Sequence, residues 1–438
     1  MTVTTTTTNK KFRMAAFDLD GTLLNSNHDL SPATITYLRH LHSKGFIIAI
    51  ATGRSAACAA HIIEKLDLDS NDENNYASDE INDGNTNDGR NNAAPSLGFP
   101  LVCTNGARGL RIRKSQSDVD VGHNTNNLVT PSSSRRCTRS NTDPLPHTEE
   151  KNANPTNPFL KRTLEISHEI FHNPLSPSLT LKTLALAHTL NCVTNYYHDH
   201  RIYAVVRNEN QLELTKRYGT LTGSEELYCY LNDLNLNSND EEGKGEKEED
   251  CDASKSTTTT TTTTTRMPYY DERNAYGYQK AVELGPPSKL LILCDTSKLD
   301  EITNLVRTEL NGTTTTKTIT SDEDVQQQQK KKQAHVIRGA PPFFVEILHP
   351  TVHKGEGLRR LCQSLSIPLE EVIAFGDGDN DLEFVQMAGW GVAMKNARGV
   401  LKEVADEVTE GSNDQDGVVK TLEWYEQEGK LHFPKEEK

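Results

Sequence analysis

The stretch Ala15-Ala16-Phe17-Asp18-Leu19-Asp20-Gly21-Thr22-Leu23-Leu24 joins an apolar run to two carboxylates and a Gly-Thr turn. Residues 13–17 predict a short buried strand that ends at the first aspartate. Residues two apart on a strand face the same way, so Asp18 and Asp20 are expected to leave its carboxyl end into one shared space. Open α/β sheets carry their chemistry at that edge. The Asp-x-Asp pattern taken alone fits a solvated turn equally well.

Two further strands are predicted to end in polar turns. The apolar run 46–51 is followed by Thr52-Gly53-Arg54, and the run 101–103 is followed by Thr104-Asn105-Gly106-Ala107. Helices are predicted after Ser31-Pro32 and from Ser55 to Leu66, where an N-cap residue precedes apolar residues at helical spacing. This alternation of strands and helices predicts a parallel sheet.

The last third of the chain again alternates predicted helices and strands. It predicts a helix over 354–365, a strand over 372–375, the turn Gly376-Asp377-Gly378-Asp379-Asn380-Asp381, a helix over 382–388 and short strands at 391–394 and 407–408. The middle differs: it predicts a hairpin over 191–197 and 201–207, strands at 289–294, 335–338 and 343–348, and a helix over 297–310. We therefore predict an α/β, doubly wound parallel-sheet core (12–108 and 351–438) with an inserted α+β cap domain (109–350).

Composition bounds the class of protein. Apolar residues make up 34% of the 438 residues and the formal net charge is -15, which disfavours a nucleic-acid groove. Four segments rich in Asn, Ser, Thr, Gln or charge are predicted to be disordered insertions: 69–95, 114–157, 237–266 and 313–333. The eight cysteines lack paired spacing, which predicts reduced thiols and no zinc site. With no apolar signal segment and no membrane-spanning run, we expect a cytoplasmic protein.

The polar groups at the predicted strand ends suit one kind of chemistry. Asp377 and Asp381, four residues apart at a helix start, can face Asp18, and carboxylate oxygens are the ligands that Mg²⁺ prefers. Thr52 and Lys354 could neutralise and orient a phosphoryl group. One of the two opening aspartates could then attack phosphorus while the other protonates the leaving oxygen.

These motifs resemble the four motifs of the haloacid dehalogenase-like hydrolase superfamily. The resemblance lies in Asp18-Leu19-Asp20-Gly21-Thr22, Thr52-Gly53-Arg54, Lys354-Gly355 and the turn from Gly376 to Asp381, and three further stretches, 104–107, 392–397 and 413–418, resemble its Cof-type phosphatases with a large cap. The resemblance implies Asp18 as nucleophile, Asp20 as general acid/base, and Thr52 and Lys354 as phosphate stabilisers. It further implies Mg²⁺ held at Asp377 and Asp381, and Asn380 near the phosphate. Lys395 departs from the small residue common in such proteins.

Together these motifs define the residues of the candidate site. The catalytic residues are Asp18 and Asp20, and the metal ligands are Asp18, Asp20, Asp377 and Asp381. The phosphate- or substrate-binding residues are Thr52, Gly53, Arg54, Asn105, Lys354 and Asn380.

Several of these residues have simpler interpretations when taken one at a time. Thr52-Gly53-Arg54 could be only a turn before a helix, and Lys354 only a solvated lysine. Asn105 fits a cap for the turn at Gly106 as well as a substrate contact. His198 and His200 invite a metal interpretation, but with no third ligand we predict an exposed hairpin turn.

The sequence thus predicts a Mg²⁺-dependent phosphatase acting on a small phosphorylated metabolite, such as a sugar phosphate or a phosphorylated cofactor. A phosphosugar mutase or phosphotransferase is the alternative within the same chemistry, and a non-catalytic binding or scaffold protein is the alternative outside it. We expect neither a nucleic-acid nor a membrane partner, and the sequence names no protein partner.

Overall fold

The computed structural model describes residues 11–68, 98–114, 164–232, 275–312, 333–339 and 341–435. The four segments predicted to be disordered lie outside these residues, apart from Lys114 and Gln333, which end and begin described segments. Of the helices within the described ranges, none has the length and apolar character needed to cross a membrane.

The larger sheet is the doubly wound sheet that the sequence predicts. Its order is β14-β13-β12-β1-β2-β3-β4-β5, parallel from β14 to β3 and antiparallel beyond. Its strands are β1 (Met14–Phe17), β2 (Ile47–Ala51), β3 (Phe99–Cys103), β4 (Arg108–Lys114), β5 (Leu164–His172), β12 (Val372–Gly376), β13 (Trp390–Ala393) and β14 (Glu407–Val408). Strands β4 and β5 fall largely within the range predicted as cap, yet they pair with the core sheet.

Core helices cover this sheet in two groups. They are α1 (Pro32–Ser43), α2 (Ala56–Leu66), α8 (Lys354–Ser364), α9 (Leu382–Met387), α10 (Gly399–Val404) and α11 (Gly417–Gln427). Helix α1 contacts α2 and α11, whereas α9 contacts α8 and α10. Strand order reverses at the neighbours β1 and β12, and right-handed crossovers therefore place the two groups on opposite faces. Ligands bind at such a reversal point in open α/β sheets.

Two predicted helix starts are capped as expected. The hydroxyl of Ser31 accepts a hydrogen bond from the Thr34 backbone N–H at 3.0 Å, and Ser55 accepts one from Cys58 N–H at 3.3 Å. Such caps satisfy backbone donors that the first turn of a helix leaves unpaired. The β2 strand between these helices is buried along its whole length, as its continuous apolar run predicts.

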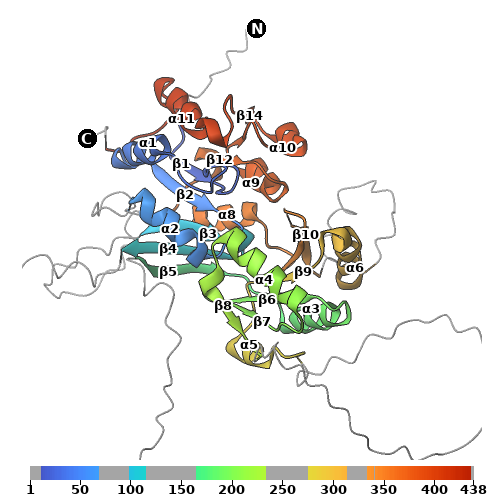
Figure 1. The fold of residues 1–438 in the computed structure, drawn as a ribbon. Coiled ribbons are helices and arrows are strands. Elements are labelled where there is room, and N and C mark those ends of the chain that lie inside the picture. Colours follow the sequence, from blue (N-terminus) through green and yellow to red (C-terminus); the bar gives the residue numbers. More distant parts are fainter. Residues whose placement is uncertain are drawn as a thin grey trace, which may run out of the picture.

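The second sheet, with its helices, is the unit we call the cap. Its order is β10-β11-β9-β6-β7-β8. Its elements are α3 (Pro177–Thr189), β6 (Val193–His198), β7 (Arg201–Ala204), α4 (Glu209–Thr222), β8 (Tyr228–Tyr230), α5 (Gln279–Leu284), β9 (Lys289–Leu293), α6 (Leu299–Asn311), β10 (His335–Arg338) and β11 (Phe344–Leu348). Figure 1 shows the green and yellow cap elements below the core, in which the blue N-terminal and red C-terminal parts lie together.

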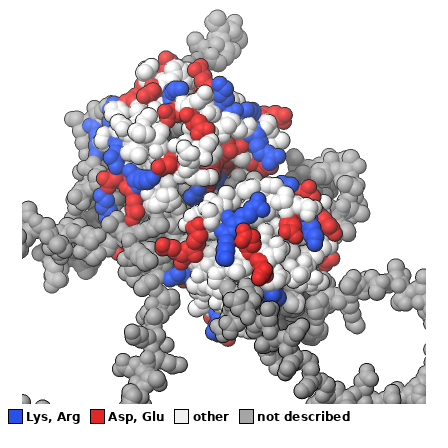
Figure 2. All heavy atoms as spheres, viewed as in Figure 1, with Lys and Arg blue, Asp and Glu red and all other residues white. Residues whose placement is uncertain are grey.

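Positive and negative side chains are interspersed over the face that Figure 2 shows.

Candidate active site

A fully buried lysine joins two aspartates at the reversal point of the core sheet. Lys354, the first residue of α8, donates hydrogen bonds from Nζ to Asp18 Oδ1 at 2.5 Å and to Asp381 Oδ1 at 2.7 Å. Burial acts to lower the pKa of Lys354, but the charges of both aspartates and their hydrogen bonds raise it above its usual value. The ammonium group is therefore charged, and the solvated-lysine interpretation is wrong.

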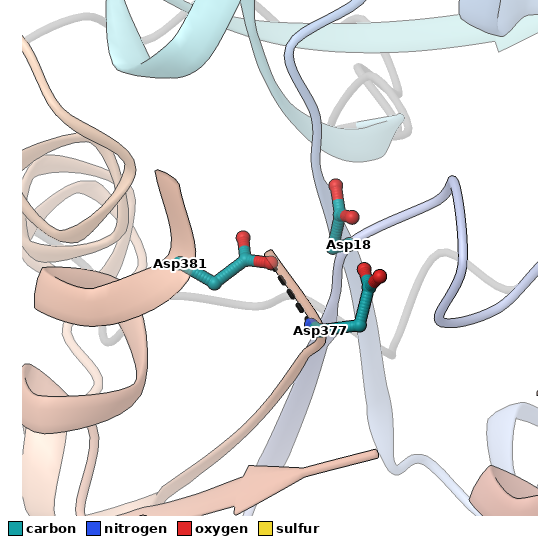
Figure 3. A group of neighbouring side chains, drawn as sticks. All are labelled: Asp18, Asp377 and Asp381. Carbon is teal, nitrogen blue, oxygen red and sulfur yellow. Dashed lines mark hydrogen bonds between the residues drawn. The ribbon is translucent and has the colours of Figure 1, made fainter. Parts of the chain in front are cut away.

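Three carboxylates gather around this position. Asp18, Asp377 and Asp381 each offer an oxygen, and these oxygens lie within 4.8 Å of one another (Figure 3). Asp381 is held in place because its Oδ2 accepts hydrogen bonds from the backbone N–H groups of Asp377 at 3.0 Å and Gly378 at 2.9 Å. The predicted metal ligands Asp18, Asp377 and Asp381 thus come together from the ends of β1 and β12.

The charge of this trio fits a divalent cation. Burial, with the charge of Asp381, raises the pKa of Asp377 to about 6. Burial also raises the pKa of Asp18 well above its usual value, Lys354 opposes that rise, and Asp381 and Asp377 add to it. One ammonium cannot neutralise three clustered carboxylates, and hard oxygen donors are what Mg²⁺ requires. The residues present therefore fit the ion.

Asp20 takes a different place from the other three carboxylates. Arg54 donates hydrogen bonds from Nε to Asp20 Oδ2 at 2.8 Å and from Nη2 to Oδ1 at 2.5 Å, and His28 Nδ1 lies 3.1 Å from Oδ1. Burial acts to raise the pKa of Asp20, but Arg54 and His28 lower it below its usual value. The structure places Asp20 against Arg54 and outside the group of three carboxylates. In this conformation each side chain is the main charged partner of the other.

The turn after β2 is organised around Thr52. Its side chain is buried, and its Oγ1 accepts a hydrogen bond from the Arg54 backbone N–H at 3.1 Å. The hydroxyl proton of Thr52 is then free to be donated elsewhere. At Gly53 a Cβ atom would lie 2.9 Å from Asn105 Oδ1, so a glycine allows the close approach of the two turns.

Asn105 lies between the core turns and the cap. Its backbone is left-handed (φ 54°), its Nδ2 donates to Glu346 Oε2 at 2.7 Å, and its Oδ1 accepts from Asn380 Nδ2 at 3.1 Å. The structure thus brings Asn105 and Asn380, two residues predicted to bind phosphate or substrate, into contact. The sequence analysis missed Glu346 and its neighbour Lys289. The available signal was a charged residue in each of two otherwise apolar strands, Lys289 at the start of β9 and Glu346 in the middle of β11, since such residues are seldom buried without a partner.

Close packing of glycines sets the position of α8. Gly106 has φ +95°, and a Cβ there would lie 2.2 Å from the His353 carbonyl oxygen. Gly357 would place a Cβ 2.9 Å from the Gly106 Cα. His353 caps α8 by accepting the Glu356 N–H at 3.2 Å, so these contacts fix where the helix begins and hence where Lys354 enters the site.

The hairpin turn that carries His198 and His200 is less exposed than predicted. The hairpin turn between β6 and β7 is present, but His198 and His200 are partly buried, and only Asp199 between them is exposed. Burial lowers the pKa of His200 to about 4. Within the described ranges, the group of metal-ligating side chains close enough to share an ion is the aspartate trio, to which neither histidine belongs. Lys395 is exposed.

Part of this chain is similar to curated phosphatases. A curated 5-amino-6-(5-phospho-D-ribitylamino)uracil phosphatase of Bacillus subtilis is 41% identical over 86 residues, 20% of this chain and 32% of the relative. A phosphoglycolate phosphatase of Methanothermobacter thermautotrophicus is 42% identical over 73 residues, 17% of this chain and 33% of the relative. The matched region thus spans about a third of each of these relatives.

Solved structures extend the likeness over the whole fold. A haloacid dehalogenase-like hydrolase from Bacteroides thetaiotaomicron superposes with a TM-score of 0.53 at 18% identity, covering 94% of this chain and 99% of that one. A Thermotoga maritima protein gives 0.52 at 19% identity, covering 94% and 97%. The model of one family matches residues 15–78 and 164–422, a range that contains the aspartate trio, Lys354 and the cap strands. This chain belongs to the family of haloacid dehalogenase-like hydrolases.

Proposed function

We propose that this chain is a Mg²⁺-dependent phosphatase that hydrolyses small phosphorylated metabolites. The observation that carries the proposal is the contact of the Asp18 carboxylate with the buried ammonium of Lys354 inside the aspartate trio. Relatives named as phosphatases of phosphorylated small molecules support the same substrate class.

The chemistry assigned to Asp18 and Asp20 follows from their surroundings. Asp18 is buried beside a cation and attacks phosphorus, forming an aspartyl-phosphate as the bond to the leaving oxygen breaks. Asp20 is the more exposed carboxylate; it gives a proton to the leaving oxygen and then takes one from the water that splits the aspartyl-phosphate.

Other residues of the site neutralise charge on the phosphoryl oxygens. The hydroxyl of Thr52 and the ammonium of Lys354 are the donors for this task. Asp18, Asp377 and Asp381 would hold Mg²⁺, which would offset the negative charge shared by carboxylates and phosphate. The cap, which contacts the core turns at Gly53 and Asn105, is the source of selectivity for the leaving group.

A hydrolysis screen over phosphorylated metabolites and p-nitrophenyl phosphate, with and without Mg²⁺, tests the proposal. We expect release of inorganic phosphate that requires the ion. A phosphoryl group recovered on an acceptor sugar instead of as free phosphate would identify a transferase. No turnover on any ester, from protein that is folded, would contradict the proposal.

A further inference from the structure

Two charged side chains of the cap reach the core turns that carry the predicted phosphate-binding residues. Lys289 donates a hydrogen bond from Nζ to the Gly53 carbonyl oxygen at 3.1 Å. Glu346 accepts the hydrogen bond from Asn105 described above. The Lys289 side chain is 1% exposed and that of Glu346 is 10% exposed, and they are 3.4 Å apart as an ion pair. Neither residue is used by the proposed mechanism.

The cap sheet places these two side chains on the same face. Glu346 in β11 is directly opposite Leu291 in β9, and Lys289 precedes Leu291 by two residues, so all three face the same way. The ring centroid of Tyr197, paired with Lys289 across β6 and β9, lies 4.9 Å from Nζ. A buried ion pair is costly to desolvate, and it is retained here with both members hydrogen-bonded to the core.

The contact of Lys289 has a consequence for Thr52. The Gly53 carbonyl and the Arg54 N–H belong to one planar peptide group and point in opposite directions. Because Lys289 holds the carbonyl, it fixes the orientation of the N–H, which donates to Thr52 Oγ1. The Thr52 oxygen is then occupied as an acceptor, and its proton remains available for a phosphoryl oxygen.

Glu346 orients Asn105 in a similar way. A carboxylate only accepts hydrogen bonds, so the Asn105 nitrogen must face Glu346 and its oxygen must face the Asn380 nitrogen. The Asn105 backbone N–H in turn donates to the Thr52 carbonyl oxygen at 3.0 Å. Both cap residues therefore act on the same short turn after β2, from two sides.

We propose that Lys289 and Glu346 are positioning residues, through which docking of the cap completes the phosphate-binding turn at Thr52. The inference rests on the proposed phosphatase function. Under this proposal, docking of the cap affects the reactivity of the phosphoryl group as well as the choice of leaving group.

The test compares the full-length chain with Lys289→Met and with a matched control, Ser288→Ala. Ser288 is the buried neighbour of Lys289; its hydroxyl contacts His172 Nε2 at 2.8 Å, where β5 of the core meets the cap. The substrate is p-nitrophenyl phosphate, whose good leaving group needs little help from the cap. Inorganic phosphate serves as a competitive inhibitor, and thermal melting of each variant is recorded.

We expect Lys289→Met to lower kcat/KM by roughly 10- to 100-fold and to weaken inhibition by phosphate. The reason is that the Thr52 hydroxyl, no longer oriented, stops donating to a phosphoryl oxygen. Lys289→Arg should recover part of the loss, and Ser288→Ala should stay close to wild type. A merely structural lysine would change the melting temperature alone. Wild-type kcat/KM and phosphate inhibition in folded Lys289→Met would overturn the inference.

A second variant keeps the test decisive if Lys289→Met folds poorly. The double variant Lys289→Met with Glu346→Gln leaves no unpaired buried charge, so it should fold and show the same loss. Normal activity in this variant would also overturn the inference. A wild-type chain that hydrolyses no phosphate ester would instead contradict the proposed function itself.

Discussion

The guanidinium group of Arg54 holds the carboxylate of Asp20 with two hydrogen bonds, at 2.8 and 2.5 Å. This contact lowers the pKa of Asp20, so the free protein keeps it ionised. An ionised carboxylate can accept a proton from water but has none to give to a leaving oxygen. The acid role proposed for Asp20 therefore requires that Arg54 release the carboxylate, and a substrate phosphate is a suitable competing anion for the guanidinium.

Arg54→Met should raise the pKa of Asp20, because the two hydrogen bonds and the opposite charge of the guanidinium group, which lower it, are lost. If Asp20 protonates the leaving oxygen, kcat/KM for a sugar phosphate falls as pH rises through this pKa. The variant should move that alkaline limb to higher pH. His28→Ala, which removes one contact, should move it less. An unmoved limb in Arg54→Met would show that another group is the acid.

The two opening aspartates should be separable by leaving group. Asp20→Asn removes general acid catalysis, typically worth about 10²- to 10⁴-fold, so p-nitrophenyl phosphate should still phosphorylate Asp18 and then stall. Asp18→Asn should show no phospho-enzyme with any substrate. Rapid-quench trapping of the aspartyl-phosphate measures both. Trapping at Asp20 in Asp18→Asn would reverse the two roles.

Loss of one carboxylate of the trio should weaken Mg²⁺ binding. Asp381→Asn removes a ligand charge, so the Mg²⁺ concentration for half-maximal activity should rise at least about 10-fold, as for other substitutions around metal ligands. Because the pKa of Asp377 is about 6 without the ion, apparent Mg²⁺ affinity should also fall as pH drops below about 6. Asp379→Asn is the control, since Asp379 lies in the same turn as Asp377 and Asp381 but pairs with Arg398. Full turnover after exhaustive chelation would contradict the magnesium proposal.

Gly106→Ala should cost both stability and activity. A left-handed alanine costs about 1 to 2 kcal/mol, and overpacking against the His353 carbonyl adds about 1 to 3 kcal/mol. Gly429→Ala isolates the first contribution, because Gly429 has φ +67° and nothing within 4 Å of its would-be Cβ. Urea unfolding gives the difference. kcat should fall in Gly106→Ala alone, since only that change displaces the start of α8; equal behaviour of the two variants would contradict this.

Glu426 should stabilise the packing of α1 on α11 only above acidic pH. Its carboxylate accepts hydrogen bonds from Tyr37 Oη at 2.7 Å and Lys44 Nζ at 2.8 Å. Burial opposes the shift, but these contacts and His40 lower its pKa to about 2. A lowered folded-state pKa adds stability above the unfolded value of about 4.5, and this stability is lost as pH falls toward 2.

Glu426→Gln should accordingly lower the melting temperature at pH 7, and its difference from wild type should shrink at pH 3. Melting curves at the two pH values measure this. Glu423→Gln, an exposed change on the same helix, should leave the melting temperature unchanged. A constant difference between Glu426→Gln and wild type across this pH range would show that the carboxylate's charge plays no part.

The sequence predicted the core, and it placed Asp18, Asp377 and Asp381 in one site, because both depend on local patterns. It also placed Asp20 among these metal ligands, whereas the structure pairs Asp20 with Arg54. An apolar run that ends at Asp18 or before Asp377 marks a buried strand and its carboxyl end. The pairing of β4 and β5 with the core was not predicted, since a long insertion separates the two strands and periodicity says nothing of partners. The contacts of Arg54 with Asp20 and of Lys289 with Gly53 depend on tertiary docking, which no spacing reveals.

Burial of Lys289 at the boundary of cap and core has a practical consequence for chemical labelling. With 1% of its side chain exposed, its amine cannot meet an acylating reagent while the cap stays docked. Its acylation rate would therefore follow the fraction of time that the two parts are apart. Exposed lysines on the same chain, such as Lys395, would give the reagent's intrinsic rate. Peptide mapping after timed acylation would then measure, at Lys289, how often the cap opens.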